Sequence, residues 1–375
     1  MMTGIQIIPV RRKKEIKAFI DLPWSIYKGD DKWVPPLKSA VKKLLSPGKH
    51  PFWKFSEREL FLAKRGDEVI GRIAAIIDGN YNQYNKEKMG IWGFFECRRD
   101  PEAFMALFSA AENWVRKKGM AFIRGPLNPS TNYEIGLLME GLEFPPSIMM
   151  TYNPAYYAEM INLCGFRKEK DLFAFLFKRE YEFPDWALPL AERISQKNEI
   201  VIRKANRKNL APDLLLMNRV YTECWGHNWG FVPMSSEELK ESVKELKYIL
   251  DPDLAFFLYH GDEAVGVFLA LPDTNPFLKH LNGKLGPSAL IKKYRYWSEI
   301  DGLRILLFGV KEKYRQMGVP LVALKQLHDV FQRKLQYNYI EASWTLEDNE
   351  AINGFFQEGG MKPYKRYRIF RKDLS

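Results

Sequence analysis

Apolar and polar residues repeat one short pattern twice along this chain. Residues 61–77, FLAKRGDEVIGRIAAII, and residues 256–271, FFLYHGDEAVGVFLAL, each place two apolar, strand-like runs around a Gly-Asp-Glu turn. Runs of this kind around a glycine turn predict a β-hairpin. The turn glycines Gly66 and Gly261 stand 195 positions apart. The pattern therefore predicts two copies of one fold.

Two further pairs of segments keep the same spacing. A strand-like run followed by a basic turn begins at Ile5 and again at Ile200, and an apolar run meets a glycine at Gly165 and again at Gly360. Each copy reads as strand, helix, antiparallel hairpin, strand, helix, strand, helix and final strand. This order predicts an α/β fold of the α+β type around a mixed sheet.

Prolines mark the junction between the copies. The stretch YEFPDWALPLAERISQKNE contains Pro184 and Pro189, which interrupt both strand and helix patterns. A chain of 375 residues is also long enough for two cores. We therefore place the boundary near residue 195 and expect domains at 1–195 and 196–375.

A basic glycine loop joins a strand to a helix in the second copy. The apolar run LRILLFGV, residues 303–310, predicts a strand, and VPLVALKQLHDVFQRKL, residues 319–335, predicts an amphipathic helix, with KEKYRQMG between them. Such a loop directs backbone N–H groups and the positive end of a helix dipole at one point. The spacing favours a bound phosphate.

This loop resembles that of the GNAT superfamily of acyl-CoA N-acyltransferases, which has Arg or Gln, two residues, Gly, one residue, then Gly or Ala. Arg315 and Gly318 fit that frame, whereas Pro320 takes the last position and removes one donor N–H. The stretch YIEASWTLEDNEAINGFFQEGGMKPYKRYRIF, residues 339–370, is similar to the family's fifth strand, Asn-containing turn, helix and final strand. The resemblance covers most of residues 200–375.

The first copy resembles the same fold over residues 5–178, but Asp100 and Pro101 stand where the glycine loop should be, which implies that this copy has lost coenzyme binding. The whole chain also resembles a bacterial branch of tandem GNAT proteins. The motifs that carry this resemblance are LPWSIYKGDDKWVPPL, GRIAAI, NPAYYAEMINLCGF, HNWGFVP and YKRYRI. Some relatives of this branch are linked to N-acylation of long-chain amines, as in bacterial ceramide synthesis.

The resemblance implies an acyl-CoA site in the second copy, for acetyl-CoA or a long-chain acyl-CoA. Backbone N–H groups near Phe308 and Val310 would hold the thioester carbonyl and the pantetheine arm. The full set of expected coenzyme contacts is Phe308, Val310, Arg315, Gln316, Met317, Gly318, Val319, Pro320, Asn349 and Phe356.

Acyl transfer to an amine needs a proton acceptor and an acid for the leaving thiolate. Glu341, on a predicted strand, is the candidate base, and its alternative role is an ordinary strand-face ion pair. In many relatives the acid is a tyrosine where this chain has Phe356, so Tyr364 or Tyr367 would replace it, unless both only pack. Asn349 either reaches the coenzyme side of the cleft or only caps the next helix.

Two segments are candidates for binding the acceptor or a surface. His227, Asn228 and Trp229 fall where relatives form the acceptor pocket, with core packing as the alternative. Residues 272–302 mix apolar and basic side chains over a connection longer than most. They would cover an acyl tunnel, lie on an anionic membrane as a peripheral contact, or form a solvated helix.

Charge and cysteine content narrow the remaining classes. The formal charge of +11 favours a polyanionic partner, but no nucleic-acid-binding motif accompanies it. The three cysteines and five histidines lack the spacing of a disulfide framework or of a metal site. No apolar run reaches the roughly 20 residues that cross a bilayer, and no signal peptide begins the chain. We therefore expect a cytoplasmic protein, at most peripheral to the inner membrane face, without a metal.

Three functions follow from these patterns. The first is an N-acyltransferase that moves an acyl group from acyl-CoA to a primary amine, with a small amine or a lipid amine as acceptor. The second is a catalytically inactive protein that binds and senses acyl-CoA. The third is a basic nucleic-acid-binding protein. The acyl length and the acceptor stay open at this point.

Overall fold

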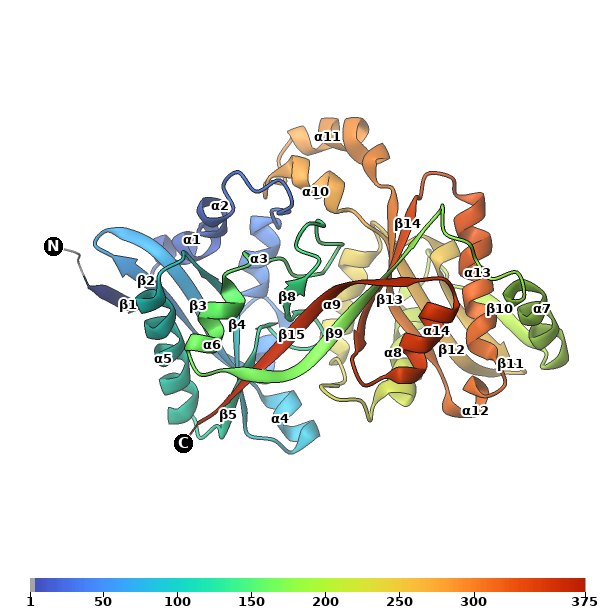
Figure 1. The fold of residues 1–375 in the computed structure, drawn as a ribbon, viewed down its shortest axis with the longest axis horizontal. Helices are drawn as coiled ribbons and strands as arrows, with labels where there is room; N and C mark the ends of the chain where they lie inside the picture. The colour runs from blue at the N-terminus through green and yellow to red at the C-terminus, as the bar shows by residue number, and fades with distance from the viewer. Residues whose placement is uncertain (1–3, 375) are drawn as a thin grey trace. The chain divides into compact units, whose positions relative to one another are not determined.

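Two compact units make up the structure, a computed structural model that describes residues 4–374. Unit 1 extends to Leu172 and also contains Leu278–Lys293 and the C-terminal segment from Lys365. Unit 2 contains Phe173–Phe277 and Tyr294–Tyr364 (Figure 1). The boundary near residue 195 divides the copies of the repeat and stays a prediction.

Unit 1 is built around a mixed sheet. The strands of unit 1 are β1 (Ile5–Pro9), β2 (Ser56–Arg65), β3 (Glu68–Asp78), β4 (Met89–Cys97), β5 (Phe122–Gly125), β6 (Leu127–Asn128), β7 (Glu134–Ile135) and β8 (Leu137–Glu140). Strands β6 and β7 form a separate two-stranded antiparallel sheet. The helices of unit 1 are α1 (Lys13–Asp21), α2 (Pro23–Ile26), α3 (Lys38–Leu44), the 3-10 turn η1 (Pro51–Lys54), α4 (Gly79–Asn85), α5 (Pro101–Lys117) and α6 (Tyr157–Leu163). Strands β1 to β4 are antiparallel, and β4 and β5 are parallel.

Unit 2 has the same plan. Its strands are β10 (Ile200–Lys204), β11 (Ala255–His260), β12 (Glu263–Pro272), β13 (Gly302–Val310) and β14 (Tyr339–Leu346). Its helical segments are α7 (Ala187–Lys197), α8 (Leu210–Trp225), α9 (Ser236–Leu246), η2 (Pro252–Leu254), η3 (Trp297–Glu299), α12 (Glu312–Arg315), α13 (Val319–Arg333) and α14 (Glu350–Glu358). Strands β10 to β13 are antiparallel, and β13 and β14 are parallel.

Four elements have residues in both units: β9 (Arg167–Lys178), α10 (Asn275–Leu281), α11 (Ser288–Tyr296) and β15 (Lys362–Asp373). The unit 1 part of β15 pairs antiparallel with β5, from Phe370 with Gly125 to Asp373 with Phe122, and with β8. The last strand of the chain therefore completes the sheet of the first unit.

Strand register confirms the repeat at the predicted spacing. Ile5 pairs with Arg65 in unit 1, and Ile200 pairs with His260 in unit 2, so both partners move by 195 positions. The hairpin bulges also correspond, between Ala63 and Lys64 and between Leu258 and Tyr259. The two copies are the same α/β fold with a mixed sheet.

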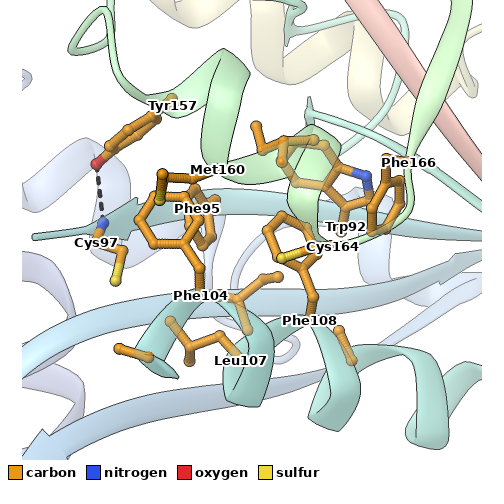
Figure 2. Close-up of a cluster of buried hydrophobic side chains, with 14 of the residues drawn as sticks. Trp92, Phe95, Cys97, Phe104, Leu107, Phe108, Tyr157, Met160, Cys164 and Phe166 are labelled. Atoms are coloured by element: carbon orange, nitrogen blue, oxygen red, sulfur yellow. Dashed lines mark hydrogen bonds between the residues drawn. The ribbon is translucent and has the colours of Figure 1, made fainter. Parts of the chain in front are cut away.

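Aromatic side chains form the core of unit 1. Figure 2 shows Trp92 and Phe95 of β4 against Phe104 and Phe108 of α5. The rings of Trp92 and Phe108 meet edge to face, with centroids 5.0 Å apart. Helix α5 buries one stripe at helical spacing, which consists of Ala103, Phe104, Leu107, Phe108, Ala111 and Val115. Each large side chain buried in this way contributes about 1.5–3 kcal/mol.

The segment that joins the copies fastens α13 in unit 2. Arg179 donates hydrogen bonds to the carbonyls of Phe331 and Tyr337, at 2.7 and 2.6 Å, beside the C-terminal end of α13. Nearer the other end, Ala187 and Ala191 of α7 pack against Leu321. Helix α7 therefore lies along α13 and supports its first turn.

Within residues 4–374, no helix is both long and apolar enough to cross a bilayer. The same residues contain no group of three or more His, Cys, Asp or Glu side chains able to hold a metal ion.

A buried carboxylate ties β15 to β9 within unit 1. Asp171 accepts hydrogen bonds from Arg366 at 2.8 Å and from Arg368 at 2.7 and 2.9 Å. Burial alone would raise the pKa of Asp171, but the hydrogen bonds from Arg368 and Arg366 outweigh it and lower the pKa to about 2. The ionised Asp171 carboxylate therefore stabilises the folded protein at pH values above its pKa in the unfolded chain. This stabilisation is lost as the pH falls through about 2.

We expect Asp171→Asn to lower the stability of unit 1 by about 2 kcal/mol at pH 7, because the two arginines lose their anionic partner. For a unit of this size, the melting temperature should fall by about 4–8 °C, measured by calorimetry. The difference between wild type and variant should shrink from pH 4 to pH 2. The control is Asp262→Asn, at an exposed turn carboxylate. A difference that persists unchanged at pH 2 would contradict this account.

Candidate active site

Strands β13 and β14 pair over only part of their length. They are hydrogen-bonded in parallel from Gly302 with Tyr339 to Ile305 with Ala342. Beyond Ile305, β13 continues to Val310 along β12, and the β12–β13 register shifts by one residue at the same point. Such a bulge bends a strand and ends pairing. The last residues of β13 therefore have one side open.

Backbone polar groups of Phe308 and Val310 face this open side. The N–H of Lys311 donates to the carbonyl of Val265, at 2.9 Å, across the ladder to β12. Antiparallel residues alternate between facing the partner strand and facing away. Phe308 and Val310, three and one positions earlier, therefore face away from β12, toward the side on which β14 no longer pairs with β13.

Their carbonyls are occupied. Trp225 at the end of α8 donates its Nε1–H to the carbonyl of Phe308 at 2.9 Å. Arg315 donates from Nε to the carbonyl of Val310 at 2.6 Å and from Nη2 to that of Cys224 at 2.9 Å. Arg315 therefore holds the loop against β13 and α8, and its role as a phosphate ligand stays a prediction.

The loop after β13 ends on Gly318, which occupies the left-handed region at a φ of 76° and precedes α13. No side chain caps this helix. In its first turn Pro320 has no N–H, and Leu321 donates to the carbonyl of Gly318 at 2.9 Å. Val319 still directs its N–H out of the helix end, where an anion would be stabilised by the dipole. Gln316 is exposed beside this point.

The equivalent groups of unit 1 are already occupied by protein. The N–H of Arg98 donates to the carbonyl of Ile70, as Lys311 does in unit 2, so Cys97 is the counterpart of Val310. The N–H of Cys97 donates to the Tyr157 hydroxyl at 2.8 Å, the dashed line in Figure 2. A ligand that needs this N–H therefore has no free donor here.

The helix end of unit 1 is also filled. The carboxylate of Asp100 accepts the N–H of Ala103 at 3.1 Å and caps α5, and Arg65 holds it at 2.8 Å. A capping carboxylate excludes a phosphate from the same place, since the two charges repel. The prediction that unit 1 lacks coenzyme is supported by both contacts and stays a prediction.

A buried polar cluster lies on one face of β14. Glu341 is fully buried and accepts hydrogen bonds from the hydroxyls of Ser343 and Tyr364. Arg304 pairs with Glu341 across the two strands, places its Nε 3.9 Å from Oε1, and donates to Ser343 Oγ at 2.9 Å. A buried carboxylate needs such partners, because an uncompensated one costs several kcal/mol. Tyr364 is half-buried and is the outer member of the cluster.

Tyr339 continues the cluster at the closed end of the strand pair. Its ring lies over Gly302, where an added Cβ would be 2.0 Å from the ring. Its hydroxyl donates to Asp273 at 2.7 Å. Burial, followed by the charge of Asp273, raises the pKa of Tyr339 far above its ordinary value. Tyr339 is therefore a neutral hydrogen-bond donor that closes the base of the opening.

Three other predicted residues have mainly structural contacts. Asn349 caps α14 by accepting the N–H of Ile352 at 3.3 Å, and its contact with the coenzyme stays a prediction. Phe356 is buried, with its ring centroid 5.8 Å from that of Phe175 and 6.4 Å from that of Phe308. Tyr367 is fully buried on the face of β15 opposite to that of Tyr364, as the alternating burial along the strand shows.

The predicted acceptor residues follow α8 directly. His227 is exposed, whereas Asn228 and Trp229 are half-buried. The N–H of Asn228 donates to the carbonyl of Trp225 at 2.9 Å, so this loop is attached to the residue that contacts Phe308. The loop therefore lies close to the open edge of β13. Which acceptor substrate it would bind does not follow from these contacts.

Arg304, Ser343 and Trp225 were not predicted from the sequence. Ser343 had a usable signal, because residues two positions apart on a strand share a face and Ser343 follows Glu341 by two positions. Arg304 had none, because its place beside Glu341 depends on the register of β13 and β14.

Two curated proteins are similar to this chain over nearly their whole length. A protein of Caulobacter vibrioides named bacterial ceramide synthase is 33% identical over 379 residues, covering 99% of this chain and 98% of that protein. Protein YghO of Escherichia coli is 32% identical, covering 96% and 94%. No protein-family model matches the chain.

Solved structures share the fold at low identity. A tandem GNAT protein from the clavulanic acid biosynthesis pathway superposes with a TM-score of 0.57 at 10% identity, covering 99% of both chains. A GCN5-related N-acetyltransferase from Sphaerobacter thermophilus gives a TM-score of 0.54 at 13% identity, covering 99% of this chain and 96% of that one. The tandem arrangement predicted from the repeat is thus confirmed at the level of the fold.

We expect Gly318→Ala to destabilise unit 2 by about 1–2 kcal/mol, because an L residue is strained at this φ. The new Cβ would also lie 2.5 Å from Cδ1 of Ile194 on α7. Thermal melting checks this against Gly286→Ala, where a Cβ meets no atom within 4 Å. Adding Ile194→Ala to Gly318→Ala should remove the clash with the new Cβ and restore only the part of the stability that the clash costs. Equal melting temperatures for the two alanine variants would refute the strain at Gly318.

Proposed function

Because the chain belongs to the family of the bacterial ceramide synthase of Caulobacter vibrioides and has the fold of a tandem GNAT protein, we propose that it is an N-acyltransferase that uses acyl-CoA in unit 2. The acceptor in this proposal is a primary amine of a long-chain lipid, since the relative's name is that of an enzyme making an N-acylated lipid.

The observation that carries the proposal is the pair of outward N–H groups at Phe308 and Val310, beside the uncapped end of α13. Two parallel N–H donors at a strand edge suit the amide groups of an extended pantetheine arm and a thioester carbonyl. The helix end suits the pyrophosphate that follows at the other end of such an arm. In unit 1 the same positions are taken by Tyr157 and Asp100, which supports assigning the coenzyme to unit 2 alone.

Bound acyl-CoA would supply a thioester whose carbonyl carbon bonds to the amine nitrogen while the C–S bond breaks and CoA leaves as a thiolate. An N–H of the β13 edge would donate to the carbonyl oxygen as negative charge develops there. Since this N–H is fixed by the strand, little reorganisation is needed when the charge appears.

Tyr364 and Glu341 would accept the proton of the attacking amine. Glu341 is too deeply buried to meet an acceptor directly, whereas the Tyr364 hydroxyl is half-buried and donates to it. The amine proton would pass to the oxygen of Tyr364 as the hydroxyl proton moves to Glu341, which leaves tyrosine neutral and the acid protonated. The Tyr364 hydroxyl would then donate a proton to the leaving thiolate as Glu341 returns its proton to the Tyr364 oxygen, so that CoA leaves as the thiol and both groups are restored. Arg304 and Ser343 would position the carboxylate for this transfer.

A protein that binds acyl-CoA without turnover is the second candidate. It is favoured by Phe356, which stands where many relatives have the acidic tyrosine, and by Arg315, whose donors are engaged by backbone carbonyls. The two candidates differ in release of free CoA thiol in the presence of an acceptor amine.

Acyl-CoA binding should raise the melting temperature of unit 2. Ligand at about 100 times its dissociation constant adds about 2.7 kcal/mol, which corresponds to a shift of about 5–10 °C for a unit of this size. We would compare CoA, acetyl-CoA and palmitoyl-CoA. Gly318→Trp should abolish the shift, whereas the matched Gly286→Trp should retain it. No shift with any of the three ligands would reject the coenzyme site.

Tyr364→Phe and Glu341→Gln should each lower kcat by about 100-fold or more, because proton acceptance contributes that much to acyl transfer. Thiol release from palmitoyl-CoA with a long-chain amine measures kcat, and the melting shift checks that coenzyme binding persists. Tyr248→Phe, at an exposed tyrosine, serves as the control. Loss of activity in Tyr367→Phe but not in Tyr364→Phe would assign the role to the other tyrosine.

A further inference from the structure

The connection between β12 and β13 exposes large apolar side chains. It contains α10 and α11, drawn in orange in Figure 1. Leu285 is 67% exposed, Leu290 78%, Ile291 72% and Tyr294 95%. Helix α11 buries none of its residues. A soluble protein seldom exposes several such side chains in one short stretch unless they bind something.

The exposed side chains of α11 lie on one face. Ile291 and Tyr294 are three positions apart and Leu290 and Tyr294 are four apart, and residues at these spacings are neighbours on a helix surface. Leu285 lies in the turn just before the helix. We call these four exposed apolar side chains the α11 patch.

Basic residues flank the α11 patch along the chain, and the patch itself contains no acidic residue. From Thr274 to Ser298 the sequence contains no Asp or Glu, and its basic residues are Lys279, Lys284, Lys292, Lys293 and Arg295, with His280. An apolar helix face flanked by lysine and arginine is the pattern of a helix that lies in the interface of an anionic membrane.

The turn before α11 is held by hydrogen bonds to other parts of unit 1, unlike a flexible loop. Within unit 1, Trp24 donates its Nε1–H to Asn282 at 2.7 Å, and the N–H of Lys38 donates to the carbonyl of Gly283 at 3.0 Å. A Cβ at Gly283 would lie 2.3 Å from the Trp24 ring, so the contact is close. Lys292 donates to the carbonyl of His280 at 2.7 Å and links the two helices. The fold therefore presents α11 from a fixed base.

We propose that the α11 patch binds the surface of an anionic phospholipid bilayer, with Leu290, Ile291 and Tyr294 entering the interface and the lysines and Arg295 meeting lipid phosphates. Charge complementarity selects this occupant over a second copy of the chain, because two identical patches of net positive charge repel. The observations lie outside the proposed acyl-transfer site, so the inference does not depend on it. Membrane contact would place the enzyme where long-chain amines reside.

Vesicle cosedimentation tests the proposal with the full chain. We would compare vesicles of phosphatidylglycerol and phosphatidylethanolamine with vesicles of phosphatidylcholine alone, at 0.1 and 0.5 M salt. The protein should bind the anionic vesicles, bind the neutral ones weakly, and dissociate as salt rises. The triple variant Leu290→Glu, Ile291→Glu, Tyr294→Glu should lower the partition coefficient about tenfold or more. Lys293→Gln with Arg295→Gln should lower it about fivefold per charge.

Matched controls separate the patch from general surface effects. Leu335→Glu changes a side chain that is 75% exposed outside this segment and should leave vesicle binding unchanged. All variants should melt as wild type does. Failure of the parent to bind anionic vesicles, or undiminished binding by the triple variant, overturns the proposal. A wild-type dimer that the triple variant abolishes would assign the patch to a second copy of the chain and also overturn it.

Discussion

The separation of β13 from β14 after Ile305 is the constraint on which the candidate site depends. A fully paired strand would use its N–H groups in the ladder and would offer none to a ligand. The register shift between β12 and β13 at the same level turns the strand and leaves Phe308 and Val310 with an open side. The uncapped end of α13 follows within a few residues of this edge. Backbone geometry thus supplies the donors, so the nature of these side chains matters little.

The two units have the same fold but differ in a few residues at the strand edge and at the helix end. Both have the hairpin, the bulge and the partly paired parallel strands, at a spacing of 195 positions in the hairpin. In unit 1 the phenol of Tyr157 and the carboxylate of Asp100 occupy the strand edge and the helix end. Each contact satisfies a backbone donor that a ligand would otherwise satisfy, and so it stabilises the ligand-free fold.

The buried cluster consists of Arg304, Glu341, Ser343 and Tyr364. It is better explained as a way of positioning the Glu341 carboxylate and the Tyr364 hydroxyl than as a source of folding stability. Burying an ion pair costs desolvation that its attraction only partly repays, and an apolar replacement of similar volume is often at least as stable. The cluster ends on the half-buried phenol of Tyr364, where the proposed function has the amine proton accepted. Its energetic cost is therefore consistent with a chemical role in unit 2.

The sequence by itself determined the repeat, the hairpins, the loop before α13 and the candidates Glu341 and Tyr364, because these depend on local periodicity, turn chemistry and short spacings. It did not reveal that β15 completes the sheet of unit 1, that Arg304 lies beside Glu341, or that Arg315 donates to Val310 and Cys224. Each of these depends on strand register or on contacts between segments far apart in the chain. Only the tertiary structure decides them, since many registers satisfy the same alternation of apolar and polar residues.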